Sequence, residues 1–250
     1  MKKGFIALWC AFLLLVFVKF TFPDDSSLPG LMVFLWSAVL SVYLLIKNGL
    51  PSKKGIIVSG ILTSLVLITG LTVHKNSAMG TVLFVSTTLL SSLAVISISG
   101  KYEDVKLLRL ESIRSVLISL LIGTAVAVPL SVINTLLGST SNTPDPSFSI
   151  GKILMAIHPG IAEDMAFRAV FMAFCVYIAG GKLTKFQTFT MYIMMMMPHG
   201  LMHNMDIRSC IVTSLIFGVP FSLLQRKRDV TSAMVSHFVV DAVRFVVFGG

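Results

Sequence analysis

The stretch GIIVSGILTSLVLITGLTV, residues 55–73, decides the fold class because it contains no charged side chain. As a helix rising 1.5 Å per residue, such a run crosses the ~30 Å hydrocarbon core of a bilayer. Segments of similar length and character recur along the chain. The predicted spans are 4–22, 29–47, 55–73, 80–98, 113–137, 153–180, 186–204, 208–225 and 231–248. We therefore predict an all-α fold, a polytopic transmembrane helical bundle of eight or nine spans.

The composition agrees with a multi-pass protein of the cell membrane. Of the 250 residues, 55% are hydrophobic and only 12% are charged, which is unlike a soluble domain. The formal net charge is +9, but the Lys and Arg residues cluster in short breaks between apolar runs. Positive charge in alternate breaks indicates the cytoplasmic side, so the lipid bilayer is the expected partner and nucleic acid is not. The N-terminus is then predicted to be cytoplasmic.

Three segments outside the apolar core of the spans carry separate expectations. The run 4–18 resembles a secretory signal but lacks a cleavage site before Pro23, so we expect a retained first helix. Residues 101–111 fit either an interfacial amphipathic helix or a loop. Residues 138–149 form the longest polar loop, which is either a mobile lid or substrate entrance, or plain solvated chain.

Ionisable residues interrupt three of the later apolar runs. They form the patches Glu163-Asp164-x-x-x-Arg168, His199-x-x-x-His203-Asn204 and His237-x-x-x-Asp241. An ionisable group at bilayer depth costs at least ~2.5–3.5 kcal/mol, so each patch is a candidate functional site. Because all three are rich in Glu, Asp and His, we predict that they converge on one centre.

The first patch combines a pair with an unpaired acid. Asp164 and Arg168 lie one helical turn apart with the acid first, the favourable order for an ion pair. Glu163 lies about 100° round the helix and is left as a candidate general base. The structural alternative is an ion pair plus an acid at a helix end.

The histidines lie on two helices. His199 and His203, at i and i+4, share a helical face, but Gly200 occupies the slot of the glutamate in a zincin motif. His237 and Asp241 have the same spacing, so Asp241 either orients the imidazole or joins it as a ligand. Internal hydrogen bonding without function is the alternative for both pairs.

The three patches, in this order on consecutive C-terminal spans, resemble the CPBP family of intramembrane proteases. That family includes CAAX-prenyl endopeptidases and bacteriocin-processing or immunity proteins. The resemblance covers residues 150–248, the predicted catalytic core, whereas residues 1–137 are N-terminal helices without a recognised motif. It implies a membrane endopeptidase that hydrolyses a peptide bond in a membrane peptide or lipid-anchored protein.

The resemblance also implies roles for individual residues. Glu163 matches the water-activating glutamate, Arg168 the motif arginine, and His203 the histidine that positions the water. His237 and Asp241 match the pair that supports the tetrahedral oxyanion. Asp164, Arg168, His199 and Asn204 are then supporting residues.

Three positions depart from the family pattern. Asp164 replaces a second glutamate, and His199 stands where Phe is usual, so either histidine is able to reach the site. Asp241 stands where Asn is common. An ionised Asp cannot donate to an oxyanion, so Asp241 must be protonated or must act by orienting His237.

The residue types permit hydrolysis with or without a metal. Zn²⁺ is possible, with Glu163, His203, His237 and Asp241 as candidate ligands. We favour a metal-free reaction, because Glu163 then acts as a base and no closed ligand shell is needed. Other function classes are a non-catalytic protein that binds or sequesters a peptide partner, in immunity or regulation, and an ion transporter.

Counting along straight spans raises a difficulty for convergence. From the cytoplasmic ends, Glu163 and His203 lie roughly 25 Å up, but His237 only about 10 Å and Asp241 about 16 Å. Tilt, a kink at Pro198 or a wrong boundary is needed to bring these groups together.

Overall fold

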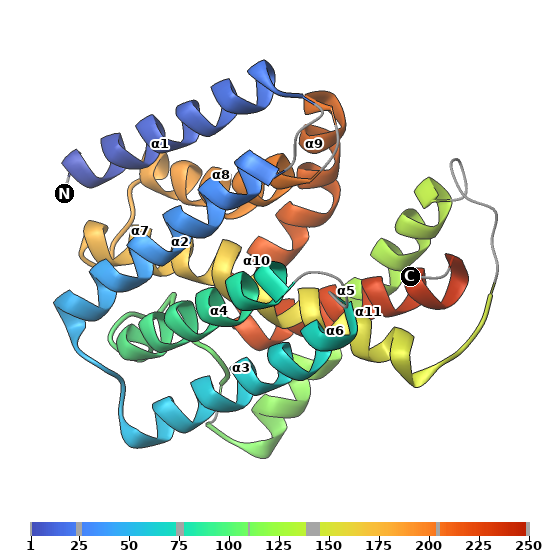
Figure 1. Ribbon diagram of the computed structural model, residues 1–250. Helices are drawn as coiled ribbons and strands as arrows, with labels where there is room; N and C mark the ends of the chain where they lie inside the picture. The colour runs from blue at the N-terminus through green and yellow to red at the C-terminus, as the bar shows by residue number, and fades with distance from the viewer. Residues whose placement is uncertain are drawn as a thin grey trace.

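The computed structural model describes residues 2–23, 27–73, 78–109, 111–138, 146–203 and 206–248. These residues form helices and no β-strand (Figure 1). Where one helix continues directly into the next, the described part of the chain forms nine rods. They are α1 (Lys2–Thr21), α2 (Ser27–Asn48), α3 (Lys53–Val73), α4 (Ala78–Ile98), α5 (Ile113–Gly138), α6 (Ile150–Glu163) continuing through the π-helix η1 (Asp164–Ala169) into α7 (Val170–Ala179), α8 (Lys185–Met202), α9 (Ile207–Thr213) continuing through the π-helix η2 (Ser214–Gly218) into α10 (Val219–Lys227), and α11 (Val230–Phe248).

The predicted all-α, polytopic class is confirmed, and each predicted segment corresponds to one rod. Seven helices of the described chain are long and apolar enough to cross a membrane: α1 to α5, the rod from Ile207 to Lys227, and α11. The outer helices expose large apolar side chains, for example Phe17 and Phe20 on α1 and Leu121 on α5. Contiguous exposed apolar surface of this kind suits contact with lipid.

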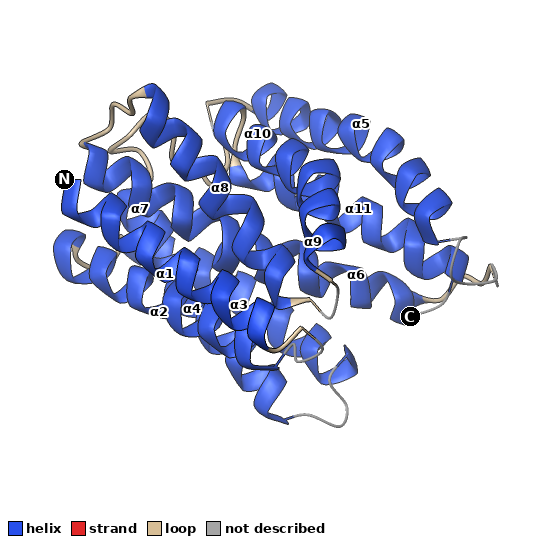
Figure 2. Cartoon of the chain, turned by 90° about the horizontal axis from the view of Figure 1, so that it is seen from above, coloured by secondary structure: helices blue, strands red, loops and turns tan. Residues whose placement is uncertain are grey.

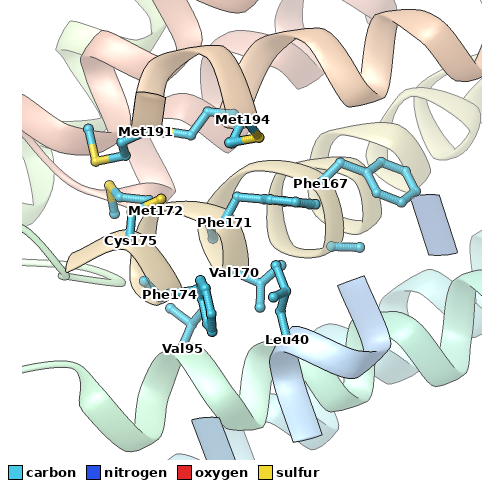
Figure 3. Close-up of a cluster of buried hydrophobic side chains, with 14 of the residues drawn as sticks. Leu40, Val95, Phe167, Val170, Phe171, Met172, Phe174, Cys175, Met191 and Met194 are labelled. Atoms are coloured by element: carbon cyan, nitrogen blue, oxygen red, sulfur yellow. The ribbon is translucent and has the colours of Figure 1, made fainter. Parts of the chain in front are cut away.

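The rod from Ile150 to Ala179 and α8 are not among these seven helices. Instead, α7 lies at the centre, with almost every side chain buried. Figure 3 shows Val170 of α7 facing Leu40 of α2 and Phe174 facing Val95 of α4, with Met191 of α8 on another side. A helix that is apolar all round belongs in the interior. The bundle therefore surrounds the rod that carries Glu163 with other helices.

The remaining helices lie on two sides of this centre. Figure 2 shows α1, α2 and α4 on the opposite side from α5 and α11. Local sequence fixes several ends: Thr184 and Gln187 form a capping box that begins α8, and Gly180 ends α7 with φ of 72°. At the start of α9, hydrogen bonds from Ser209 hold the pKa of the Asp206 carboxyl below its usual value.

Helix α11 is held at its first turn by a loop rather than by a helix. Residues 101–109 are not helical, so of the two predictions for this segment the loop is correct for the described part. The N–H groups of Val230 and Thr231 donate to the carbonyls of Lys106 and Leu107 at 3.0 and 2.9 Å. The buried Asp229 accepts from the N–H of Ser232 at 2.8 Å. These bonds satisfy donors that a helix start leaves unpaired.

Helices α5 and α11 run parallel and in close contact. A Cβ placed on Gly123 would lie 2.5 Å from the carbonyl oxygen of Ser232, and one on Gly138 would lie 2.8 Å from the ring of Phe248. Residue numbers thus rise together along both helices, which fixes the register of α11 against α5. The predicted polar loop 138–149 falls partly on residues 139–145, which lie outside the described residues.

Candidate active site

The three polar patches meet where the middle of the central rod, the end of α8 and the middle of α11 come together. The groups that meet are Glu163, Asp164, Arg168, His199, His203, His237 and Asp241. Asn204, which was predicted as a supporting residue, lies outside the described residues. Two π-helices, η1 and η2, flank this point. Such local widening of a helix is frequent at functional sites.

Glu163 is the hub of the histidine contacts. Its Oε2 lies 2.7 Å from Nε2 of His199 and 3.7 Å from Nε2 of His237. The side chain is mostly buried, with 13% exposed. His199, rather than His203, thus makes the direct contact with the carboxylate. The sequence left both histidines open as candidates, and the structure places both at the site.

Arg168 binds three side chains at once. It forms an ion pair with Asp164, and both side chains are buried. Its Nη1 lies 3.3 Å from Nδ1 of His237, and its Nη2 lies 3.1 Å from Nδ1 of His199. The ring of Phe221 covers the guanidinium, with Cζ 5.1 Å from the ring centroid. The arginine therefore joins the central rod to α8 and α11.

This contact pattern sets the protons on two imidazoles. A guanidinium donates hydrogen bonds and accepts none. If each ring is neutral and accepts from Arg168, its N–H lies at Nε2; Nδ1 of His237 also lies 3.6 Å from Oδ2 of Asp164, which is beyond hydrogen-bond distance. Nε2 of His199 faces Glu163, and Nε2 of His237 lies 3.4 Å from Oδ2 of Asp241. Both rings consequently direct an N–H toward a carboxylate.

His203 is the C-cap of α8, where the backbone leaves the helix. Its Nε2 lies 3.0 Å from Nε2 of His199. Its carbonyl accepts from the ammonium of Lys19 on α1 at 3.1 Å, and the same ammonium donates to the carbonyl of Pro23 at 2.9 Å. Lys19 is fully buried. The first helix therefore fixes the end of the helix that carries both histidines.

Small residues let α8 approach η2. A Cβ on Gly200 would press on Oγ of Ser214, and a Cβ on Gly218 would lie 3.1 Å from Cβ of Met196. Glycine removes these clashes and brings the last turn of α8 against η2. The histidines are thereby held next to the cavity that η2 borders.

A cavity of about 270 Å³ opens beside these groups. It is lined by Asn134, Pro159, Glu163, Arg168, Met196, His199, Gly200, His203, Thr213, Ser214, Phe217, Gly218, Phe221, His237, Val240, Asp241, Arg244 and Phe245. Since about 10–15 Å³ of such volume is enough for one water, the space holds several water molecules. The lining combines the acids and histidines with apolar side chains such as Phe217, Phe221 and Val240. Water and an extended segment of peptide both fit such a space.

The donor set can be tested for a zinc ion. Glu163, His199 and His203 each offer one ligand atom, and these atoms lie within 4.8 Å of one another. This set contains His199, whereas the set predicted from the sequence names His237 and Asp241 instead. A histidine that binds zinc through Nε2 carries its proton on Nδ1 and donates it to an acceptor. Arg168 faces Nδ1 of His199 with a donor, so the arrangement fits zinc poorly.

The expected separation of His237 from Glu163 along straight spans does not occur. The estimate assumed that all spans start at one level, but the loop 101–109 and Asp229 hold the first turn of α11 inside the bundle. His237 is therefore level with Glu163, although it lies only two turns from the start of its helix.

Some site residues were not singled out from the sequence. Lys19 and Arg244 each interrupt an apolar run, so the cost of charge in a membrane would have marked them. Asn134, Ser214 and Phe221 give no such signal, because a single Asn, Ser or Phe is ordinary in a span.

Searches against protein-family models, curated proteins and solved structures find no match for this chain.

Proposed function

We propose that this protein is an intramembrane endopeptidase of the cell membrane that uses Glu163 to activate water. The substrate is a membrane-associated peptide or a lipid-anchored protein, as the resemblance to CPBP proteases implies. In the proposed topology the N-terminus is cytoplasmic, on the side where the basic breaks between spans gather.

The observation that carries the proposal is the setting of Glu163. Its carboxylate borders a cavity large enough for water and peptide, and the N–H of His199 orients it at 2.7 Å. Carboxylates positioned beside bound water are effective general bases. Because Arg168 fixes the tautomers of both rings, His237 presents an N–H at Nε2 for a developing negative charge.

The proposed hydrolysis needs no group beyond water and these side chains. Glu163 takes a proton from a water molecule that His203 helps to hold, and the hydroxide attacks the peptide carbonyl carbon. The carbonyl oxygen becomes an oxyanion and accepts from Nε2–H of His237. Glu163 then returns the proton to the leaving nitrogen as the C–N bond breaks, giving a carboxylic acid and an amine.

Asp241 acts in this scheme by holding His237 in the resting site, where it faces Nε2–H of the ring; the developing oxyanion then replaces Asp241 as the acceptor of this one N–H. Oδ2 of Asp241 lies 3.4 Å from Nε2 of the imidazole. The phenyl ring of Phe221 stacks on the face of the imidazole, with the two ring centroids 4.9 Å apart. The carboxylate and the phenyl ring together limit rotation of His237. This role does not require Asp241 to donate a hydrogen bond to the oxyanion.

The test is peptide hydrolysis by the purified protein in proteoliposomes. A set of apolar and lipid-modified peptides is incubated in water enriched in ¹⁸O, and mass spectrometry detects new carboxyl ends that carry the label. Glu163→Gln keeps the shape of the side chain but removes the base, so we expect a loss of at least ~100-fold. Glu111→Gln is the matched control, because Glu111 is exposed and distant in the fold from this site.

The outcomes separate the proposal from its alternatives. Activity that survives in Glu163→Gln contradicts the role of the glutamate. Absence of cleavage by the wild type, together with tight peptide binding, indicates a sequestering protein instead. Activity that a chelator removes and zinc restores would contradict the metal-free reaction, for which we expect no change.

A further inference from the structure

The central rod changes its winding just after Glu163. In an α-helix the N–H of Val170 would donate to the carbonyl of Ala166, four residues back. In η1 this N–H donates instead to the carbonyl of Met165, five residues back. The carbonyl of Ala166 is thus passed over by the N–H group that an α-helix would supply. Because such wide turns are rare, a contact from outside the rod is expected to favour this one.

A hydroxyl group on the neighbouring helix α2 binds the carbonyl that is passed over. Oγ of Ser37 donates a hydrogen bond to the carbonyl oxygen of Ala166. Ser37 is fully buried, and Ala166 is only 1% exposed. Water therefore does not replace the hydroxyl easily, and a buried carbonyl that loses its donor is costly. The bond from α2 compensates for the bond that the π-helix gives up.

Aromatic side chains hold α2 beside η1. The rings of Phe34 and Phe167 meet edge to face with centroids 5.1 Å apart, and those of Trp36 and Phe171 meet in the same way at 4.9 Å. Phe167 in turn stacks on the imidazole of His199, with centroids 5.7 Å apart and ring planes 17° apart. These contacts fix the serine hydroxyl opposite η1 and connect α2 with the site.

We propose that Ser37 is a positioning residue of the site, because its hydroxyl keeps η1 in the π register, with hydrogen bonds five residues back. A return to the α register turns the residues before η1 by about 100° and shifts them by about 1.5 Å relative to α7. Glu163 directly precedes η1, and its Oε2 lies 2.7 Å from Nε2 of His199. A rotation of that size breaks this contact. Ser37 thereby gives the first 137 residues, which carry no recognised motif, a part in the site.

Nuclear magnetic resonance of the full-length protein in nanodiscs tests the register without hydrolysis. Histidine is labelled with ¹⁵N, and the proton on Nε2 of His199 is assigned by its loss in His199→Gln. A proton that faces a carboxylate at 2.7 Å resonates downfield of one that has lost this partner. In Ser37→Ala we expect the ratio of the downfield to the displaced signal to fall by about 5- to 150-fold, as for a buried carbonyl that loses its donor.

A second serine on α2 provides the matched control. Ser41 is equally buried, but its hydroxyl donates to the carbonyl of Ser37 within its own helix at 2.8 Å. Ser41→Ala should therefore leave the downfield signal unchanged. Ser37→Thr keeps a hydroxyl and should restore most of the signal. Ser37→Cys offers a weaker donor and should give an intermediate ratio; it also takes the place of Ser37→Ala if that variant does not fold.

The rate of hydrolysis is a second readout, and for this rate the inference rests on the proposed function. Ser37 is not among the residues that line the cavity. Ser37→Ala should therefore lower kcat and kcat/KM equally, with KM nearly unchanged. Loss of binding to the cavity would instead raise KM.

Three results would overturn the role of Ser37. The first is an unchanged downfield signal in Ser37→Ala, and the second is an equal loss of that signal in Ser41→Ala. The third is a ratio in both Ser37→Thr and Ser37→Cys as low as in Ser37→Ala. If the signals behave as expected but the wild type cleaves no peptide, the proposed function fails while the role of Ser37 in the register stands.

Discussion

Gly123→Ala should disable the site from a helix that contributes no acid or histidine to it. The added methyl would lie 2.5 Å from the carbonyl oxygen of Ser232 and 3.1 Å from Cβ of Val235. A backbone carbonyl within a helix cannot rotate away, so α11 itself has to retreat by roughly 1 Å to reach van der Waals separation. His237 lies five residues further along that helix and moves with it.

Two opposing effects set the expected change in the free energy of unfolding of Gly123→Ala, and the displacement of His237 sets the expected change in the rate of hydrolysis. Overpacking costs about 1–3 kcal/mol, whereas replacing Gly by Ala within a helix returns up to about 1 kcal/mol. We expect a net loss of about 0–2 kcal/mol in the free energy of unfolding, which leaves the protein folded. A displacement of 1 Å at a reacting group costs about 100-fold in rate, so peptide hydrolysis should fall far more than stability.

The assay compares hydrolysis and thermal unfolding of Gly123→Ala with those of Gly60→Ala. Gly60 lies within α3, and a Cβ there meets nothing within 4 Å, so this control should keep full activity. Adding Val235→Ala to Gly123→Ala removes the side-chain clash but not the carbonyl clash, and should restore only part of the rate. Equal activity of Gly123→Ala and Gly60→Ala would refute the reasoning.

Two further substitutions test the supports of the site. Lys19→Met removes the donor to the His203 carbonyl but also the cost of a buried ammonium, so the free energy of unfolding should change by less than about 1 kcal/mol. The rate of hydrolysis should fall, and Lys19→Arg should restore it. A loss of stability in proportion to the loss of activity would show that Lys19 has a structural role only. Asp229→Ala removes the cap of α11 and the partner of Ser119, which should cost about 2–4 kcal/mol in the free energy of unfolding, measured by chemical denaturation. Asp104→Ala is the control: Asp104 forms a partly exposed pair with Arg226, so its loss should cost under about 1 kcal/mol in the same measurement.

Periodicity and the cost of intramembrane charge were sufficient to predict the helices and the acids and histidines that gather at the site, but Lys19 and the uncharged residues around them were not predicted. Spacing along one helix fixes the angle between side chains, so the pairing of Asp164 with Arg168 was predictable. It gives no translation of one helix against another. The level of His237 therefore could not be predicted, because it depends on hydrogen bonds that the first turn of α11 donates to the carbonyls of Lys106 and Leu107, which are far away in sequence.

Spacing along one helix also could not predict which of the two histidines contacts Glu163. Their i, i+4 spacing shows only that His199 and His203 share a face, and the choice of His199 as the partner of Glu163 depends on where α8 ends. Lys19 and Gly200 set that end, the first by binding the carbonyl of His203 and the second by admitting Ser214. Neither contact has a local sequence pattern, since each joins residues on different helices.

The position of each rod in the bundle explains why seven of the nine rods in the described chain are apolar enough to cross a membrane, whereas the rod from Ile150 to Ala179 and α8 are not. The outer helices meet lipid and must be apolar, whereas the rod from Ile150 to Ala179 packs against α2, α4 and α8 (Figure 3) and against α11. This enclosed rod can carry Glu163, Asp164 and Arg168. Charge at this depth is tolerated because protein groups replace water around it: Asp164 pairs with Arg168, and the guanidinium reaches two imidazoles. The same enclosure strengthens these interactions. A rod that is less apolar than a lipid-facing span, yet is surrounded by apolar helices, is therefore a place where a membrane bundle can hold ionisable side chains beside a cavity.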